Sequence, residues 1–266
     1  VRPRKGAIIR DEAEQALEAL ERGAWVGEGR YAKIENDDFT FLGELDFAGR
    51  TLLVALKQIV APKSIFGWAR ARSPRRRARR QWRGAEQLEA LGVPTGSPVL
   101  LATGRLDGRR CDWLLMRHVP GTDLLHHLAQ QDLSVKEEHD AARRTGKLVA
   151  TIDSYGWFNR DTKLSNLIRL PTGEVAAIDT VDIQRRPGRR VRMLRAMLAE
   201  ALGHDVVPRR TLMMRTLREA VEEPHVVWRE LEAFAAKHQD DRPRVNLLDQ
   251  PHARTKTPTS ASPVGE

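Results

Sequence analysis

The 266-residue chain has a single cysteine, Cys111, and no long apolar run. One cysteine cannot form an internal disulfide, and the sequence also lacks cysteine pairs and any His/Cys cluster with the spacing of a metal site. No segment approaches the roughly 18 consecutive apolar residues that a membrane span needs, and no apolar signal-peptide core follows the basic N-terminal residues. We therefore expect a soluble, cytoplasmic protein.

Acidic residues are outnumbered, since 45 Lys and Arg against 36 Asp and Glu give a formal net charge of +9. The arginines are densest between Arg70 and Arg83. Such a block favours a polyanionic partner, such as anionic lipid headgroups or a phosphorylated glycan, although its arginines could instead pair with acids elsewhere on a solvated helix face. Nucleic acid is an unlikely partner because no groove-reading motif accompanies the charge. The arginines of this run are Arg70, Arg72, Arg75, Arg76, Arg77, Arg79, Arg80 and Arg83.

The first 118 residues combine helical and strand patterns. Apolar residues at helical spacing predict helices over residues 11–21 and 74–91. Apolar runs bounded by turn residues predict two or three antiparallel strands between residues 25 and 60, and two more strands at residues 99–102 and 113–119. This part of the chain therefore predicts a small antiparallel sheet interrupted by one helix.

From Pro120 onward the pattern is mainly helical. Helical segments are predicted at residues 124–128, 136–155, 193–202, 208–221 and 225–238. Pro, Ser and Thr dominate after residue 250, where we expect no ordered structure.

A polar motif, Phe-Asn-Arg-Asp-Thr-Lys-Leu-Ser-Asn-Leu-Ile at residues 158–168, precedes the apolar segment Val-Ala-Ala-Ile-Asp at residues 175–179. The turn residues Pro-Thr-Gly at 171–173 lie between the two, which predicts a compact hairpin. Such a hairpin would carry Asn166 at the start of one strand and Asp179 after the other. The two oxygen donors should therefore lie close together.

This spacing suits phosphoryl transfer, which needs a carboxylate to orient the attacking hydroxyl and oxygen ligands to hold Mg²⁺ on the phosphates. Asp161 is the candidate for the first task, with Lys163 placed to steady the transferring phosphate. Asn166 and Asp179 are the candidate metal ligands. A lone Asp or Asn is usually turn chemistry, and Asp182 is a second candidate for the metal, but Asp179 directly follows the apolar strand and is preferred.

The segment Asn-Arg-Asp-Thr-Lys-Leu-Ser-Asn at residues 159–166 resembles the H-R-D-x-K-x-x-N catalytic loop of the protein-kinase-like fold. Ile178 and Asp179 are similar to the site of the magnesium aspartate in its D-F-G motif, and Val-Ala-Leu-Lys at residues 54–57 looks like V-A-I-K. The resemblance implies that Lys57 binds the nucleotide phosphates.

Within that fold, residues 52–202 resemble the bacterial lipopolysaccharide core kinases, which phosphorylate Kdo or heptose. The resemblance is carried by the arginine-rich run into Arg-Gln-Trp-Arg at residues 80–83, by residues 88–95 and by residues 114–124. It implies that the segment from Arg117 to Val119 is the hinge whose backbone contacts adenine, with Met116 at the back of the nucleotide pocket.

The sequence departs from the kinase pattern in three places. Gln81 stands where the family has the glutamate that pairs with the phosphate-binding lysine, so either Glu86 or Glu89 takes that role or Lys57 is held more loosely. No G-x-G-x-x-G loop precedes Lys57. Asn159 replaces the histidine of the catalytic loop, and Thr and Val follow Asp179 in place of Phe and Gly, which argues against a regulated protein kinase more than against catalysis.

These features predict an α+β, two-lobed protein-kinase-like fold with a nucleotide between the lobes. The expected parts are an N-terminal lobe (1–118), a helical C-terminal lobe (119–250) and a tail (251–266). ATP and Mg²⁺ are the expected cofactors, and the expected acceptor is a hydroxyl of a lipopolysaccharide core sugar or similar lipid-linked glycan at the inner face of the cytoplasmic membrane, with the arginine run against the anionic surface. The alternatives are a kinase acting on protein or a small metabolite, and a pseudokinase scaffold. The site residues are Asp161 and Lys163 for catalysis, Asn166 and Asp179 for the metal, and Lys57, Gln81, Met116, Arg117 and Val119 for the nucleotide.

Overall fold

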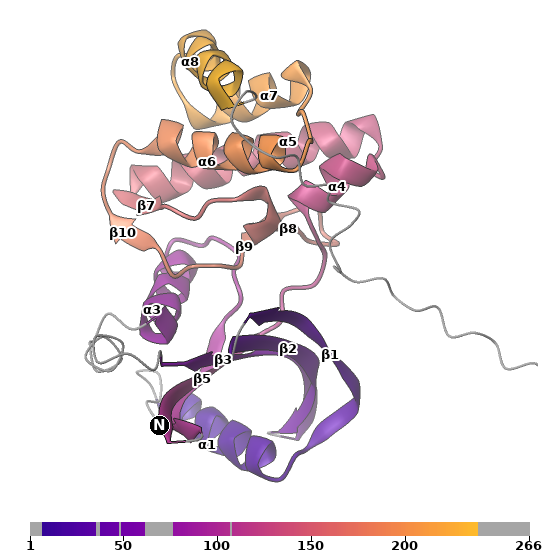
Figure 1. The fold of residues 1–266 in the computed structure, drawn as a ribbon, viewed down its shortest axis with the longest axis vertical. Coiled ribbons are helices and arrows are strands. Elements are labelled where there is room, and N and C mark those ends of the chain that lie inside the picture. The colour runs from indigo at the N-terminus through magenta and orange to yellow at the C-terminus, as the bar shows by residue number, and fades with distance from the viewer. Residues whose placement is uncertain (1–6, 36–37, 48, 62–76, 107, 239–266) are drawn as a thin grey trace, which may run out of the picture.

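The computed structural model describes residues 7–35, 38–47, 49–61, 77–106 and 108–238. These residues form two lobes, one built on a sheet and the other on helices, with short strands between them (Figure 1). The predicted α+β, two-lobed kinase-like fold is confirmed.

The sheet lobe contains five antiparallel strands in the order β1-β2-β3-β5-β4. Three strands lie between residues 25 and 60, the larger of the two numbers that the sequence allowed. Strands β3 and β5 pair although helix α3 (Arg77–Ala90) lies between them in the chain, and β4 and β5 form a hairpin after that helix. The five strands therefore form one continuous sheet. The strands are β1 (Trp25–Glu35), β2 (Asp38–Phe47), β3 (Arg50–Val60), β4 (Pro98–Leu106) and β5 (Arg109–Arg117).

Two helices cover opposite faces of this sheet. Helix α1 (Ala7–Glu21) buries its alanines against a cluster that includes Leu115, whereas α3 (Arg77–Ala90) buries Trp82 against a cluster that includes Leu114. Because successive side chains of a strand point to opposite faces, the neighbours Leu114 and Leu115 serve different helices. The same alternation along β3 puts Lys57 on the α3 face, since Leu56 packs with the α1 cluster.

The second lobe is a helical layer with its own buried core. Helix α5 is the longest, and a capping box between Ser134 and Glu137 fixes its start, because each residue satisfies a backbone N–H of the other. Its buried face contacts α6 and α7. The helices are α4 (Leu124–Gln130), α5 (Val135–Ser154), α6 (Arg190–Gly203), α7 (Arg210–Ala220) and α8 (Pro224–His238).

Short strands join the helical layer to the sheet lobe (Figure 1). Strand β8 (Leu167–Arg169) pairs with β6 (Thr122–Asp123) on one side and with β9 (Val175–Ala177) on the other. Strand β7 (Trp157–Asn159) pairs with β10 (Ile183–Arg185). The motif residues that follow β7 reach β8 through a single 3₁₀ turn, η1 (Leu164–Asn166), so the polar motif lies in a loop as predicted.

Two expectations concern segments that are not described. Arg70, Arg72, Arg75 and Arg76 of the arginine run lie outside the described residues, as do residues 239–266, which include the predicted tail (251–266). Over the residues that are described, none of the helices has the length and apolar character to cross a membrane.

Candidate active site

The catalytic loop is held in shape by Asn159 and Thr162, which are both buried. The Asp161 backbone N–H donates to the Asn159 side-chain oxygen at 3.1 Å, and the Thr162 hydroxyl donates to the Asn159 carbonyl at 2.6 Å. The Asn159 amide also donates to the Asp179 carbonyl at 3.3 Å. The asparagine that replaces the kinase histidine therefore ties the loop to the segment after β9.

The hairpin brings Asn166 and Asp179 to one end, as the sequence predicted. Leu167 is paired with Ala177 in the β8–β9 register, and one step further the Ile178 N–H donates to the Asn166 carbonyl at 2.9 Å. The turn closes through Gly173, whose φ of +84° favours glycine. The register thus places Asp179 just past the backbone bond that holds Asn166.

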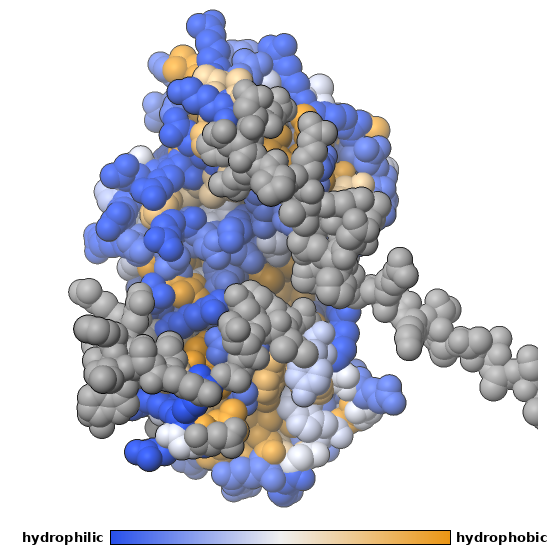
Figure 2. All heavy atoms as spheres, viewed as in Figure 1, coloured by the Kyte–Doolittle hydropathy of each residue, from blue (hydrophilic) through white to orange (hydrophobic). Residues whose placement is uncertain are grey.

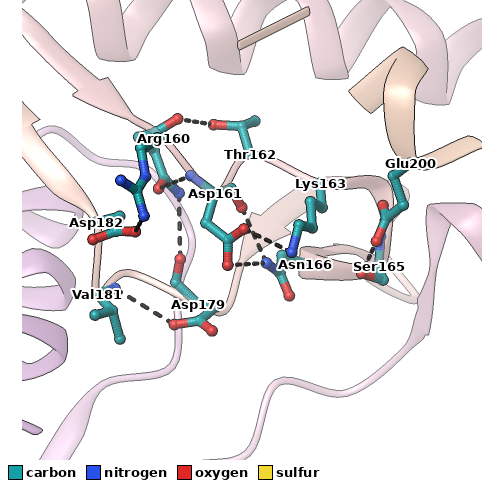
Figure 3. A network of polar contacts seen from close by, with 11 residues as sticks. Arg160, Asp161, Thr162, Lys163, Ser165, Asn166, Asp179, Val181, Asp182 and Glu200 are labelled. Carbon is teal, nitrogen blue, oxygen red and sulfur yellow. Dashed lines mark hydrogen bonds and ion pairs between the residues drawn. The ribbon is translucent and has the colours of Figure 1, made fainter. Parts of the chain in front are cut away.

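Asp161, Lys163 and Asn166 form one polar cluster (Figure 3). Lys163 Nζ lies 2.9 Å from Asp161 Oδ1, and the Asn166 amide donates to Asp161 Oδ2 at 3.3 Å and to the Asp161 carbonyl at 3.0 Å. Each carboxylate oxygen can accept a second hydrogen bond. Asp161 is about one-third exposed, so a hydroxyl group arriving from solvent can reach it.

The hydrogen bond to Asp161 raises the pKa of Lys163 above its ordinary value, and the negative charges of Asp161, Glu200 and Asp179 act in the same direction. Lys163 therefore stays protonated at neutral pH. The protonated ammonium of Lys163 has three N–H donors, so it can donate to a phosphate oxygen while it keeps its bond to Asp161.

Asp179 and Asp182 differ in their partners, which the sequence could not show. Asp182 forms two ion pairs: Oδ1 lies 3.0 Å from Arg80 Nη1, and Oδ2 lies 3.1 Å from Arg160 Nη2. Asp179 forms no ion pair with any described residue, and only one of its carboxylate oxygens accepts a hydrogen bond, from the Val181 N–H at 3.4 Å. Because Asp179 forms no ion pair with a described residue, it stays the preferred candidate for the metal.

The donor set fits Mg²⁺. Asp179 supplies one carboxylate, and the Asn166 side-chain oxygen accepts no hydrogen bond from a described residue, since the amide nitrogen of Asn166 makes the bonds to Asp161. The described residues contain no cluster of three His, Cys, Asp or Glu that could hold a metal alone. One carboxylate and one amide leave the remaining positions to phosphate oxygens and water, which is the coordination that Mg²⁺ prefers.

Helix α3 docks directly on the segment that carries Asp179. The Thr180 hydroxyl donates to the Gln81 carbonyl at 2.7 Å. Gly84 faces the same residue so closely that a Cβ at position 84 would lie 2.1 Å from the Thr180 carbonyl oxygen. The glycine is therefore required for this contact, which sets Asp179 beside the helix of the sheet lobe.

Lys57, Gln81 and Met116 lie on or against the α3 face of the sheet. The buried Gln81 amide donates to Met116 Sδ at 3.4 Å, and Met116 is the register partner of Ala55, two residues before Lys57. Of the two glutamates considered as substitutes for Gln81, Glu89 accepts a hydrogen bond from the Ser97 hydroxyl. Through this bond Gln81 contacts the end of β5, the strand that precedes the hinge.

The hinge follows β5 and connects the two lobes. The Arg117 N–H donates to the Ser97 carbonyl at 2.8 Å, and the His118 N–H donates to the Leu53 carbonyl at 3.0 Å. The Val119 N–H makes no hydrogen bond to a described residue. Val119 therefore has the hinge N–H that a ligand can use.

Glu200 is a site residue that the sequence reasoning missed. Its two carboxylate oxygens accept from the Ser165 N–H at 3.0 Å and from the Ser165 hydroxyl at 2.5 Å (Figure 3). Glu200 lies on α6, 35 residues after Ser165, so no local pattern links the two. The contact anchors the 3₁₀ turn that ends at Asn166.

Comparison with known proteins agrees with this geometry. A model of the lipopolysaccharide kinase (Kdo/WaaP) family matches residues 67–197. The matched segment contains the Asp161, Lys163, Asn166 and Asp179 cluster and the hinge, while Lys57 precedes it. The resemblance to the lipopolysaccharide core kinases is confirmed. A search of curated proteins found no match.

Proposed function

We propose, from the match of residues 67–197 to the lipopolysaccharide kinase (Kdo/WaaP) family, that this protein is an ATP-dependent kinase acting on a lipopolysaccharide core sugar. It transfers the γ-phosphoryl group of ATP to a hydroxyl of Kdo, heptose or a similar lipid-linked glycan. The observation that carries the proposal is the polar cluster of Asp161, Lys163 and Asn166, with Asp179 at the same end of the hairpin as Asn166.

The residues divide into two groups by their task. Asp161 accepts a hydrogen bond from the sugar hydroxyl and orients it for attack, and Lys163 stabilises the charge of the transferring phosphoryl group. Asn166 and Asp179 hold Mg²⁺, which supplies positive charge to the ATP phosphates when bound.

The nucleotide is bound by residues of the sheet lobe and the hinge. Lys57 binds the phosphates, the backbone at Arg117 and Val119 contacts adenine, and Met116 closes the back of the pocket. Gln81 supports that wall through its hydrogen bond to Met116. A lipid-linked acceptor would bring the protein to the inner face of the cytoplasmic membrane, where the exposed Arg77 and Arg83 contact anionic lipid.

One observation favours a second candidate, a pseudokinase scaffold. Gln81 is neutral, almost fully buried and bonded to Met116, so no carboxylate at that position pairs with Lys57. The kinase pattern has a glutamate at this position, and the neutral Gln81 cannot supply the charge by which that glutamate pairs with the phosphate-binding lysine.

The experiment is transfer of label from γ-labelled ATP with Mg²⁺ to three acceptors: purified lipopolysaccharide core, a protein extract and small aminosugars. We expect label in the lipopolysaccharide core, at a level at least about tenfold above the other two. Label in protein or in an aminosugar alone would assign the kinase to that acceptor instead. Binding of MgATP without label in any acceptor would favour the scaffold.

Glu200→Gln should slow transfer without weakening nucleotide binding. A glutamine has an NH₂ donor in place of one carboxylate oxygen, so one of the two acceptor atoms that bond Ser165 is lost, and the bond that is kept is weaker because the acceptor is no longer charged. We expect kcat to fall about tenfold, the rate equivalent of about 1.4 kcal/mol, with the KM for ATP changed less than about twofold. Steady-state kinetics over a range of ATP concentrations measure both values.

The double variant Ser165→Ala with Glu200→Gln separates positioning from general stability. If Glu200 acts through Ser165, the two substitutions should cost less together than the sum of their separate effects. Additive losses, or a fall in melting temperature that parallels the loss of kcat, would contradict the positioning role.

A further inference from the structure

A second arginine-rich segment lies directly beside the catalytic loop. Six arginines occur between β10 and the middle of α6, and residues 183–199 contain no Asp or Glu. Figure 2 shows hydrophilic residues gathered over β10 and the start of α6. The arginines are Arg185, Arg186, Arg189, Arg190, Arg192 and Arg195.

Two of the six are used by the fold. Arg190 Nε lies 2.7 Å from Asp153 Oδ2, a buried carboxylate, and Arg195 pairs with Glu230. The side chains of the other four are exposed and form no ion pair with any described residue: Arg185, Arg186, Arg189 and Arg192. Their charge is therefore available to a ligand.

Local contacts tie this charge to the catalytic loop. Arg185 is the register partner of Trp157 in β7, and Arg192 lies 5.5 Å from the centre of the Phe158 ring. Two residues after Asn159, the last residue of β7, the chain reaches Asp161. Arg160 lies between them and its side chain is 62% exposed. Arg160 and Arg80 both pair with Asp182, so two positive charges face one negative charge. Arg185 and Arg192 thus lie against the strand that leads to Asp161, Arg160 follows that strand, and Arg186 and Arg189 lie between β10 and α6.

We propose that Arg160, Arg185, Arg186, Arg189 and Arg192 form an acceptor subsite that binds the carboxylate or phosphate groups of the sugar to be phosphorylated. The subsite rests on the proposed kinase function, and it is separate from the arginine run at residues 70–83. Guanidinium groups bind carboxylate and phosphate through paired N–H donors, so several exposed arginines select a polyanionic acceptor over a neutral one. Because they contact groups away from the reacting hydroxyl, they contribute to acceptor binding more than to the chemical step.

The test compares Arg185→Gln/Arg186→Gln with Arg218→Gln/Arg229→Gln. The control arginines are exposed on α7 and α8 and form no ion pair with any described residue. Replacing them removes the same amount of positive charge. The probe is a deacylated lipopolysaccharide core oligosaccharide that carries Kdo and phosphate, and its binding is measured calorimetrically without ATP at low and at physiological salt. We expect the first pair to weaken binding about tenfold at low salt and less at higher salt, and the control pair to change it less than about twofold. In the transfer assay the first pair should raise the KM for this acceptor with kcat and the KM for ATP nearly unchanged.

Equal binding by the two double variants would overturn the subsite. The same variants are also tested for binding to vesicles containing anionic phosphatidylglycerol. A loss of binding that is confined to these vesicles would also overturn the subsite, because that result assigns the arginines to a membrane contact. Failure of the kinase assignment gives a different result: the oligosaccharide binds and depends on Arg185 and Arg186, but no phosphoryl group is transferred. In that case the subsite stands and the proposed function fails.

Discussion

Asp161→Asn should lower kcat by about 10²–10⁴-fold, the range that a positioned general base contributes, and leave the affinity for ATP nearly unchanged. Asparagine has almost the same shape but cannot take a proton from the acceptor hydroxyl. It also loses the ion pair with Lys163 Nζ at 2.9 Å, while its side-chain and backbone oxygens can still accept hydrogen bonds from Asn166. The expected defect is therefore in the chemical step.

Single-turnover transfer and equilibrium binding of ATP with Mg²⁺ measure the two quantities separately. Glu174→Gln is the matched control, because Glu174 is an exposed carboxylate at the turn end of the same hairpin. We expect this control to retain nearly full kcat. Full turnover by Asp161→Asn, or an equal loss in both variants, would remove Asp161 from the role of base.

The hairpin was predictable from the sequence because the interactions that form it are local. Two apolar runs, a Pro-Thr-Gly turn and the two-residue period of strands were enough to place Asn166 and Asp179 at one end, as the bond from the Ile178 N–H to the Asn166 carbonyl shows. The five strands of the sheet lobe and the helices of both lobes were predictable for the same reason, since their patterns repeat within a few residues. The short strands β6, β7 and β10 were not predicted.

Contacts between distant segments were not predictable. The Thr180 hydroxyl meets the Gln81 carbonyl across 99 positions of the chain, and the close approach at Gly84 depends on how α3 docks on the segment after β9. The sequence alone does not show whether a glycine within a helix is needed for a close contact. The packing of the two lobes gives Gly84 its function.

The arginine-rich segment from β10 to the middle of α6 was missed for a different reason. Its arginines were visible in the sequence as a run without acidic residues, but the denser run at residues 70–83 drew the interpretation instead. Charge density alone does not show which arginines are already paired. Arg80 belongs to the denser run and is held by Asp182, whereas Arg185 and Arg186 form no ion pair with the residues that the structure describes.

The choice between Asp179 and Asp182 also depended on long-range partners, and it leads to the second large effect. Asp179→Ala should abolish most of the magnesium-dependent part of ATP binding. Loss of a group that merely supports a metal ligand already costs about 10–100-fold in metal affinity, so loss of the carboxylate ligand itself should cost at least about 100-fold. Titration of ATP with excess Mg²⁺ and with EDTA gives the magnesium-dependent part directly.

Asp182→Ala is the matched control because it removes the neighbouring carboxylate. Its partners Arg80 and Arg160 are 41% and 62% exposed, so breaking both pairs should cost only about 1 kcal/mol of unfolding free energy. We expect this variant to bind ATP with an unchanged dependence on Mg²⁺ and to melt slightly earlier. The reverse pattern, with magnesium dependence lost in Asp182→Ala and kept in Asp179→Ala, would move the metal to Asp182. Since Asp182 is already neutralised by two guanidinium groups and Asp179 by none among the described residues, a divalent cation gains more by binding at Asp179.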